Sequence, residues 1–313
     1  MKKILITISI VLSLSLVIAG GVGYYFSNVL LMQNFTENYG KTSDTVENIK
    51  QFKALQEELE NEKITIPSSY GYDLVGYYFP AKKDTNRTII TVHGYQSSKD
   101  SQAKYIKMYH ELGFNVVTYD QRNHGESGGT YTTYGLIESE DLKDVVSYVK
   151  DRQTNNKEKG LIGIHGVSMG AATTLQYAGN VEDKADFYIA DCAYSNFGEE
   201  AKYRLAEDYS YIPAFLHKPI VFLGDTVLKI RENYSIFSAS PIDTVENIKS
   251  PVLFINTKTD DYIPPYMTQD LFDKTVGPKE IYWTDTGKHA KAFDVNPDQY
   301  KEVVINFLEK HIK

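Results

Sequence analysis

The 313-residue chain lacks the residues that several classes of site require. It contains a single cysteine, Cys192, so it forms no internal disulfide bond and no zinc cluster of several thiolates. Lys2 and Lys3 are the only charges in residues 1–33, and the remainder carries 31 basic and 41 acidic side chains, a net charge of −10. Nucleic-acid binding needs a basic surface, so this balance argues against a nucleic-acid partner.

The N-terminal segment has no charge over a long stretch. Residues 4–26 are uncharged and mostly apolar. As a helix they would span roughly 34 Å, enough for the ~30 Å hydrocarbon core of a bilayer. Residues 1–33 therefore form either a retained signal-anchor, favoured by the length and by interfacial aromatics such as Tyr24, or a signal peptide with a cleavage site at Val17-x-Ala19.

The charges that flank this segment predict its orientation. The positive-inside rule places Lys2 and Lys3 in the cytoplasm and the rest of the chain outside it. We therefore expect a body anchored on the outer side of the cell membrane, or secreted if the leader is cleaved. No cysteine follows the apolar run, which excludes a lipoprotein.

The chain beyond the leader divides into two parts. Residues 34–62 are polar and charged, with Leu55 and Leu59 at helical spacing, so we predict a polar stalk that contains a short helix. Residues 63–313 alternate short apolar strands with helices, which is typical of a mostly parallel sheet covered on both faces. Strands are expected at 63–66, 74–79, 87–92, 115–119, 161–164, 185–190, 251–255 and 280–283, and helices at 103–112, 135–151 and 303–312.

One strand of this series leads into the pattern Gly166-x-Ser168-x-Gly170, and a helix start rich in small residues follows it. A Cβ at either glycine would collide with the strand and helix chains, which approach each other closely at such a turn. The free N–H groups at the start of the new helix favour negative charge beside the serine. This context predicts that Ser168 is a nucleophile.

Partners for this serine are expected at the ends of other strands, where ligands bind in parallel sheets. His289 follows the last predicted strand and can reach Ser168 as a base. Asp260 is the predicted acid, because the acid-x-x-aliphatic-Pro spacing places it first in its loop, ahead of Asp261. Asp191 is a weaker third candidate for the acid.

Three other histidines are expected to play no part in the chemistry. His165 lies within the strand that leads to the serine, so we predict a packed side chain. His110 and His311 fall on predicted helices, where we expect them to face solvent.

The motifs in this order resemble those of α/β-hydrolases in the serine-aminopeptidase-like, monoglyceride-lipase-like esterase group. The resemblance covers about residues 63–313 and rests on five motifs, at residues 93–95, 120–128, 166–170, 260–264 and 287–289. It implies an α/β-hydrolase fold with a mostly parallel sheet of about eight strands, helices on both faces and a small helical cap inserted at about 196–240. It also implies that the backbone N–H groups of Tyr95 and Met169 form the oxyanion hole, while His93 and residues 120–128 shape the floor of the site.

The function implied by the resemblance is a serine hydrolase that cleaves carboxylic esters through an acyl-enzyme, with no metal or organic cofactor. The cap segment is rich in aromatic and aliphatic residues. It forms either a lid over an acyl pocket or two ordinary helices at the sheet edge, and beside a membrane it favours medium-chain acyl esters or lysolipids as small-molecule substrates. The alternatives are lysophospholipase activity, a peptidase of the aminopeptidase type, and a non-catalytic binding module of the cell envelope. No acidic anchor for a peptide amino terminus is evident in the sequence, which ranks the peptidase second.

Overall fold

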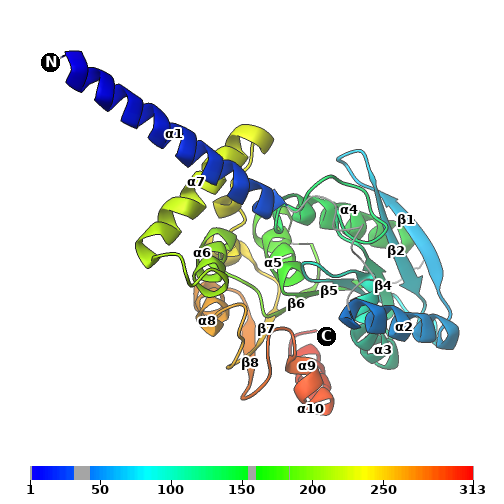
Figure 1. Ribbon diagram of the computed structural model, residues 1–313. Helices are drawn as coiled ribbons and strands as arrows, with labels where there is room; N and C mark the ends of the chain where they lie inside the picture. Colours follow the sequence, from blue (N-terminus) through cyan, green and yellow to red (C-terminus); the bar gives the residue numbers. More distant parts are fainter. Residues whose placement is uncertain (1, 32–42, 154–159, 183, 313) are drawn as a thin grey trace.

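The computed structural model describes residues 2–31, 43–153, 160–182 and 184–312, and its centre is a single sheet (Figure 1). Eight strands follow the order β1-β2-β4-β3-β5-β6-β7-β8, and β2 is antiparallel to both of its neighbours while the other pairs are parallel. The strands are β1 (Glu62–Pro67), β2 (Asp73–Phe79), β3 (Arg87–Val92), β4 (Asn115–Tyr119), β5 (Leu161–Val167), β6 (Phe187–Asp191), β7 (Val252–Thr257) and β8 (Lys279–Thr284).

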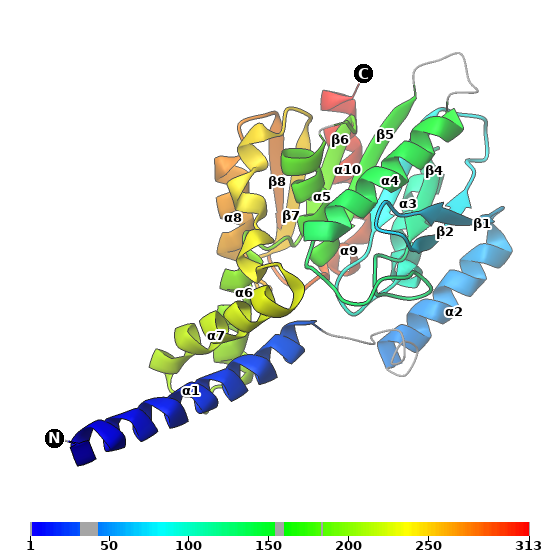
Figure 2. The same cartoon turned by 90° about the horizontal axis from the view of Figure 1, so that it is seen from above.

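Helices cover both faces of this sheet, as Figure 2 shows from above. On one face α4, α5 and α8 pack against strand residues such as Ile90, Val117 and Ile164, which lie side by side in register. On the other face α2, α3, α9 and α10 pack against residues such as Ile89 and Val116. The helices are α1 (Lys2–Leu31), α2 (Ser43–Glu58), α3 (Ala103–Glu111), α4 (Leu136–Gln153), α5 (Met169–Gln176), α6 (Phe197–Asp208), α7 (Ala214–Glu232), α8 (Pro265–Lys274), α9 (Ala292–Val295) and α10 (Pro297–His311).

The predicted architecture is confirmed. The central strands are buried on both faces, which explains why their sequences are almost continuously apolar. Most predicted strands and helices agree with the observed ones to within a few residues. The last helix begins earlier than predicted, at Pro297, because Asn296 caps it by accepting the N–H of Gln299.

Residues 34–62 were expected to form a polar stalk, but the helix in the described part of this segment packs on the domain. Residues 32–42 lie outside the described part, and α2 packs on the domain. Its Phe52 and Leu55 are buried against Phe79 and Ile89 of the sheet and against α3. Burying these two side chains removes their apolar surface from water, which a free stalk would leave exposed.

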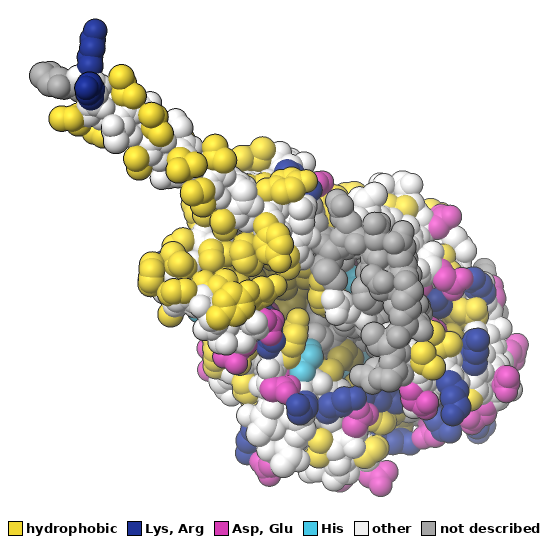
Figure 3. Space-filling view, in the orientation of Figure 1, with side chains coloured by type: hydrophobic (Ala, Val, Ile, Leu, Met, Phe, Trp, Pro, Cys, Tyr) yellow, Lys and Arg dark blue, Asp and Glu magenta, His cyan; other side chains and the backbone are white. Residues whose placement is uncertain are grey.

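The cap region contains two helices, α6 and α7, with a small apolar core of their own. Leu205, Val221 and Leu228 are buried in this core, and Phe26 and Leu30 of α1 pack against it. α1 crosses α7 and then projects away from the body (Figures 1 and 2). In the space-filling view, apolar side chains cover both α1 and the neighbouring cap surface (Figure 3).

A glycine allows α1 and α7 to approach closely. A Cβ at Gly23 would lie 2.8 Å from Cγ2 of Val227 and 2.9 Å from the carbonyl oxygen of Leu223, closer than such atoms pack. Arg231 of α7 donates hydrogen bonds of 2.7 Å to Ser27 Oγ and to Asn28 Oδ1 of α1. The last turns of α1 are therefore packed on the cap.

Candidate active site

Ser168 lies at the turn between β5 and α5, in a backbone conformation that few non-glycine residues adopt. Its φ is 56° and its ψ is −120°, a geometry that costs about 1–3 kcal/mol. A Cβ on Gly166 would overlap the carbonyl oxygen of Gly170, and a Cβ on Gly170 would overlap that of Val92. Both glycines are thus required sterically, as the sequence pattern predicts.

A chain of hydrogen bonds joins Ser168 to the two predicted partners. Nε2 of His289 lies 2.8 Å from Oγ of Ser168, and Nδ1 lies 2.9 Å from Oδ2 of Asp260. These distances fit a neutral imidazole that carries its proton on Nδ1 and accepts the serine hydroxyl proton on Nε2. Residues from β5, from the loop after β7 and from the loop after β8 meet here because the carboxyl ends of these parallel strands share one edge.

The other predicted acids lie elsewhere. Asp261 is exposed and pairs with Lys288 at 3.1 Å; the hydrogen bond from Lys288 lowers the pKa of Asp261. Asp191 is fully buried and accepts a 2.9 Å hydrogen bond from the Tyr300 hydroxyl, whereas Nδ1 of His289 is hydrogen-bonded to Asp260. Burial raises the pKa of Asp191 to about 6.

The remaining histidines are packed. His165 is buried and hydrogen-bonded to Tyr109 and Tyr300, as predicted. The expectation of solvent-facing positions is wrong for His110, which is buried with Nε2 3.0 Å from the carbonyl of Pro80. It is wrong for His311 too, whose side chain is 15% exposed and lies 2.8 Å from Glu280. Both helices turn these rings toward polar partners at the domain edge.

The backbone expected to supply the oxyanion hole passes close to the serine. A Cβ on Gly94 would lie 3.2 Å from Cβ of Ser168, so the chain that leads into the turn at Tyr95 is adjacent to the nucleophile. Met169 is the first residue of α5, and its N–H has no partner within the helix. Both backbone segments therefore lie beside Ser168, where the sequence predicts an oxyanion hole of two backbone donors.

His93 holds this turn in place. Its Nε2 accepts the N–H of Gln121 at 2.9 Å, and its Nδ1 lies 2.7 Å from the carbonyl of Gly94. Burial lowers the pKa of His93 well below its usual value, so the ring is neutral and matches this pattern of one donor and one acceptor.

The loop at 120–128 is organised by a buried carboxylate. Asp120 is fully buried, pairs with Lys99 at 2.6 Å and accepts the backbone N–H groups of Lys99 and Glu126 at 2.8 Å each. A Cβ on Gly125, at a φ of 52°, would overlap this carboxylate. The loop is therefore a rigid support beneath the site.

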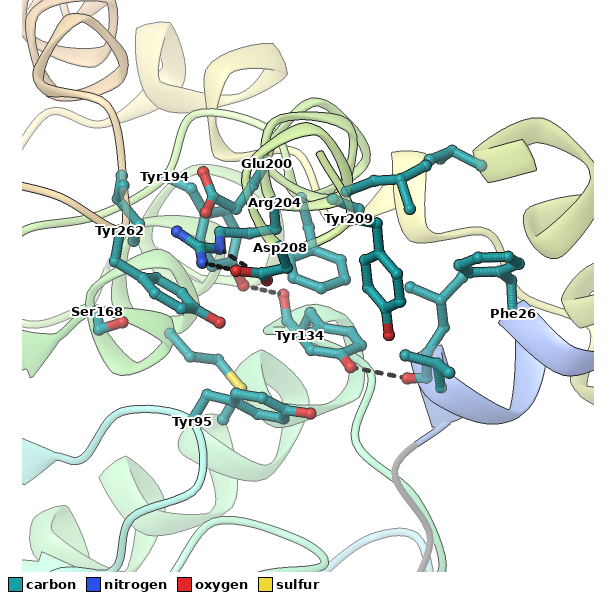
Figure 4. Close-up of a pocket in the computed structure, with 18 residues that line it drawn as sticks. Phe26, Tyr95, Tyr134, Ser168, Tyr194, Glu200, Arg204, Asp208, Tyr209 and Tyr262 are labelled. Carbon is teal, nitrogen blue, oxygen red and sulfur yellow. Dashed lines mark hydrogen bonds and ion pairs between the residues drawn. The ribbon is translucent and has the colours of Figure 1, made fainter. Parts of the chain in front are cut away.

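Ser168 opens into an apolar cavity of about 170 Å³ (Figure 4). Its walls come from the last turns of α1, the cap helices, the start of α5, the loop containing Tyr134, and the loops after β3, β6 and β7. The lining residues include Phe26, Val29, Leu30, Tyr95, Tyr134, Met169, Tyr194, Phe197, Glu200, Arg204, Asp208, Tyr209, Val221, Tyr262 and Ile263. Aromatic and aliphatic side chains dominate, as in pockets for apolar ligands.

One acidic lining residue, Glu200 of α6, was not anticipated from the sequence. Its side chain is buried, and neither carboxylate oxygen has a hydrogen-bond partner among the described residues. Burial raises the pKa of Glu200 to about 8, so the carboxyl is mostly protonated at neutral pH. No acidic anchor for a peptide amino terminus was evident in the sequence, yet the fold places this carboxyl group in the cavity of Ser168. Glu200, Arg204 and Asp208 are spaced four residues apart and so share one helix face. This spacing is the sequence feature from which charged residues in the cavity could have been predicted.

A second, polar cavity of about 550 Å³ lies on the other side of the serine. Ser168 and His289 line it together with Gln51 of α2 and the charged side chains Lys104 and Lys291. The reacting serine thus lies at the boundary between an apolar cavity and a polar one.

A metal ion is a poor fit to this cluster. Ligand atoms of Cys192, Asp260 and His289 lie within 4.8 Å of one another. However, burial raises the pKa of the Cys192 thiol well above its usual value, which disfavours the thiolate that a metal needs. The hydrogen bond between His289 and Asp260 already uses the other two groups.

Comparison with known proteins places these features in a family. Residues 83–201 match the family described as serine aminopeptidase, S33. The chain is 40% identical over 311 residues to the uncharacterized protein YqkD of Bacillus subtilis, which covers 99% of this chain and 98% of that protein. It is 26% identical to the lysophosphatidylserine lipase ABHD12 of Mus musculus over 67% of this chain and 51% of that longer protein.

Among solved structures, the esterase Pf2001 of Pyrococcus furiosus superposes with a TM-score of 0.66 and 26% identity, over 83% of this chain and 94% of that one. The sheet order and the serine turn at its carboxyl edge define an α/β-hydrolase. The chain belongs to the α/β-hydrolase superfamily, in the group of serine-aminopeptidase-like and monoglyceride-lipase-like esterases, as its motifs predicted.

Proposed function

We propose that this hydrolase is a serine esterase that cleaves acyl esters, with Ser168 as nucleophile, His289 as general base and acid, and Asp260 as the group that orients His289. The observation that carries the proposal is the hydrogen-bonded chain from Asp260 through His289 to Ser168, at the mouth of an apolar cavity. The likeness to an esterase and to a lysophosphatidylserine lipase supports it.

The mechanism follows from these positions. His289 takes the proton of Ser168 as Oγ attacks the acyl carbonyl, and Asp260 stabilises the resulting imidazolium. The N–H groups of Tyr95 and Met169 donate to the oxyanion, and each such donor lowers the barrier by about 3 kcal/mol. His289 then gives its proton to the departing alcohol, and water attacks the acyl-enzyme with His289 again as base.

The two cavities suggest the kind of ester. An acyl chain fits the apolar cavity, and the polar cavity on the other side of Ser168 accommodates the alcohol portion. The proposed substrate is therefore an amphiphile with a single acyl chain, such as a medium-chain ester or a lysolipid.

The location of the enzyme is part of the proposal. Among the described residues, α1 is a helix long and apolar enough to cross a membrane. We assign residues 1–33 to a membrane anchor and 63–313 to a hydrolase domain outside the cytoplasm, because Lys2 and Lys3 lie at the start of α1 and no acidic residue follows them within the helix.

The test uses the full-length protein in detergent, a fluorophosphonate probe and p-nitrophenyl esters of increasing chain length. We expect wild type and Ser168→Ala to fold alike and only wild type to be labelled and to turn over esters. Ser238→Ala is the matched control, since Ser238 is exposed and lines neither cavity. Folded wild type that is neither labelled nor active would support a non-catalytic binding module instead.

Glu200 favours a second candidate, a peptidase that recognises a free amino group. An ammonium group would favour the ionised form of Glu200 and pair with it, since neither carboxyl oxygen has a hydrogen-bond partner among the described residues. This candidate predicts hydrolysis of aminoacyl p-nitroanilides, lost in Glu200→Gln, whereas the esterase proposal predicts that esters are the better substrates.

A further inference from the structure

We propose that the last turns of α1 form a wall of the acyl-binding cavity and that the acyl chain of a membrane amphiphile reaches Ser168 along this wall. The inference rests on the proposed ester hydrolysis and goes beyond it. It makes the membrane helix part of the substrate site, in addition to its role as an anchor.

The first observation is the composition of the cavity. Phe26, Val29 and Leu30 of α1 line the same cavity as Ser168. Figure 4 shows Phe26 and Ser168 at opposite sides of it, with Tyr134 and Tyr209 between them. Without α1, the cavity would lack the wall that faces the serine.

The second observation is that this wall is attached firmly to the body. The hydroxyl of Tyr134 donates a 2.7 Å hydrogen bond to the carbonyl of Leu30. Tyr134 is buried, and its ring stacks on Phe197 of the cap and packs beside Tyr95. The contact thus connects α1 to the residue whose N–H is assigned to the oxyanion hole.

The third observation concerns where the cavity opens. Val29 lines the cavity and is also 41% exposed, so the cavity reaches the surface beside α1. Large apolar side chains of α7 are exposed in the same region, with Phe215 at 77%, Phe222 at 62% and Ile230 at 80%. Figure 3 shows apolar surface continuing from α1 over the cap.

These exposed side chains identify the occupant as lipid. A patch of this kind on a soluble surface is a liability, whereas a helix beside a membrane buries such side chains in the interface. α1 packs closely on α7 at Gly23, and residues 4–23 would span about 30 Å as a helix. Phe26 and Leu30 would then lie just outside the hydrocarbon core, where the ester end of a lipid chain is found.

The test compares two leucines of the same helix in full-length protein reconstituted in phosphatidylcholine nanodiscs. Leu30→Trp adds bulk to the cavity, while Leu16→Trp changes a side chain that is 73% exposed and far from it. We expect Leu30→Trp to lower the ratio of kcat/KM for p-nitrophenyl laurate to that for the butyrate by about tenfold or more. Leu30→Ala, which enlarges the cavity, should raise that ratio, and Leu16→Trp should leave it unchanged.

A binding measurement separates this inference from the catalytic proposal. Ser168→Ala protein in nanodiscs is irradiated with a lysophosphatidylcholine that carries a diazirine on its acyl chain close to the ester. We expect labelling of the peptide that contains Met169, at the cavity floor, and weaker labelling when Leu30→Trp is added, but not when Leu16→Trp is added.

Absence of floor labelling, or equal effects of the two tryptophans on labelling and chain-length ratio, would overturn the inference. If floor labelling follows the expected pattern while wild type hydrolyses no ester, the lipid pathway stands and the esterase proposal fails.

Discussion

Nδ1 of His289 lies 2.9 Å from Oδ2 of Asp260, and the other oxygen of this carboxylate accepts the backbone N–H groups of Tyr262 and Ile263 at 2.9 Å each. The side chain of Asp260 is completely buried. Three hydrogen bonds therefore fix the carboxylate, and through it the orientation of the imidazole ring.

Replacing this carboxylate with an amide should impair catalysis without unfolding the protein. We expect Asp260→Asn to lower kcat for a short-chain ester by roughly 10³- to 10⁴-fold, because the amide stabilises the wrong imidazole tautomer. Asp261→Asn is the control, since Asp261 is exposed and its carboxylate contacts Lys288 and the backbone N–H of His289. Equal losses in both variants would argue against the assignment of Asp260.

The ion pair beneath the site predicts a large stability effect. Lys99→Met leaves the buried carboxylate of Asp120 without its cation, and such losses destabilise by about 3–5 kcal/mol. Lys63→Met removes an exposed pair with Glu126, for which we expect at most about 1 kcal/mol. Urea unfolding followed by the fluorescence of the single tryptophan, Trp283, measures both, and similar values would contradict the structural role of Lys99.

Glu200 predicts a pH dependence of stability. Burial raises the pKa of Glu200 from 4.5 to about 8 on folding. Between these values the folded chain holds a proton that the unfolded chain has released, so this group contributes stability that is lost as pH rises from 4.5 to about 8.

Glu200→Gln stays neutral at every pH. The melting temperature of this variant should therefore rise relative to that of wild type as the pH increases from about 5 to about 9. Glu199→Gln is the matched control, because Glu199 is exposed on the same helix. Parallel melting-temperature profiles for wild type and Glu200→Gln would show that Glu200 is solvated.

The close packing of α1 on α7 predicts an asymmetry between two glycines. A leucine at Gly23 would overlap Val227 and the carbonyl of Leu223, whereas nothing among the described residues lies within 4 Å of a Cβ at Gly20. We expect Gly23→Leu to cost about 1–3 kcal/mol of packing and to speed hydrogen exchange in α7, with no such change in Gly20→Leu. Equal exchange in the two variants would mean that the helices do not pack as described.

Much of the fold and part of the candidate site were predictable, because local rules produce them. Continuous apolar runs predicted buried parallel strands, and the glycines around Ser168 predicted a tight turn whose geometry only glycine allows. Asp260 and His289 could be proposed because each follows a strand, and parallel strands end at one edge. The spacing of the loop also predicted that Asp260, and not Asp261, faces the imidazole. This spacing is a local property of the sequence.

Tertiary packing decided the rest. The sequence alone determines that α1 is apolar and that α2 carries Phe52 and Leu55 three residues apart, but helix periodicity does not reveal which surface covers such a face. Only the folded chain places Phe26 and Leu30 in the cavity of Ser168 and buries Glu200 with no hydrogen-bond partner among the residues that the structure describes. These features depend on contacts between residues far apart in the chain, whose free energy comes from surfaces that meet only after folding.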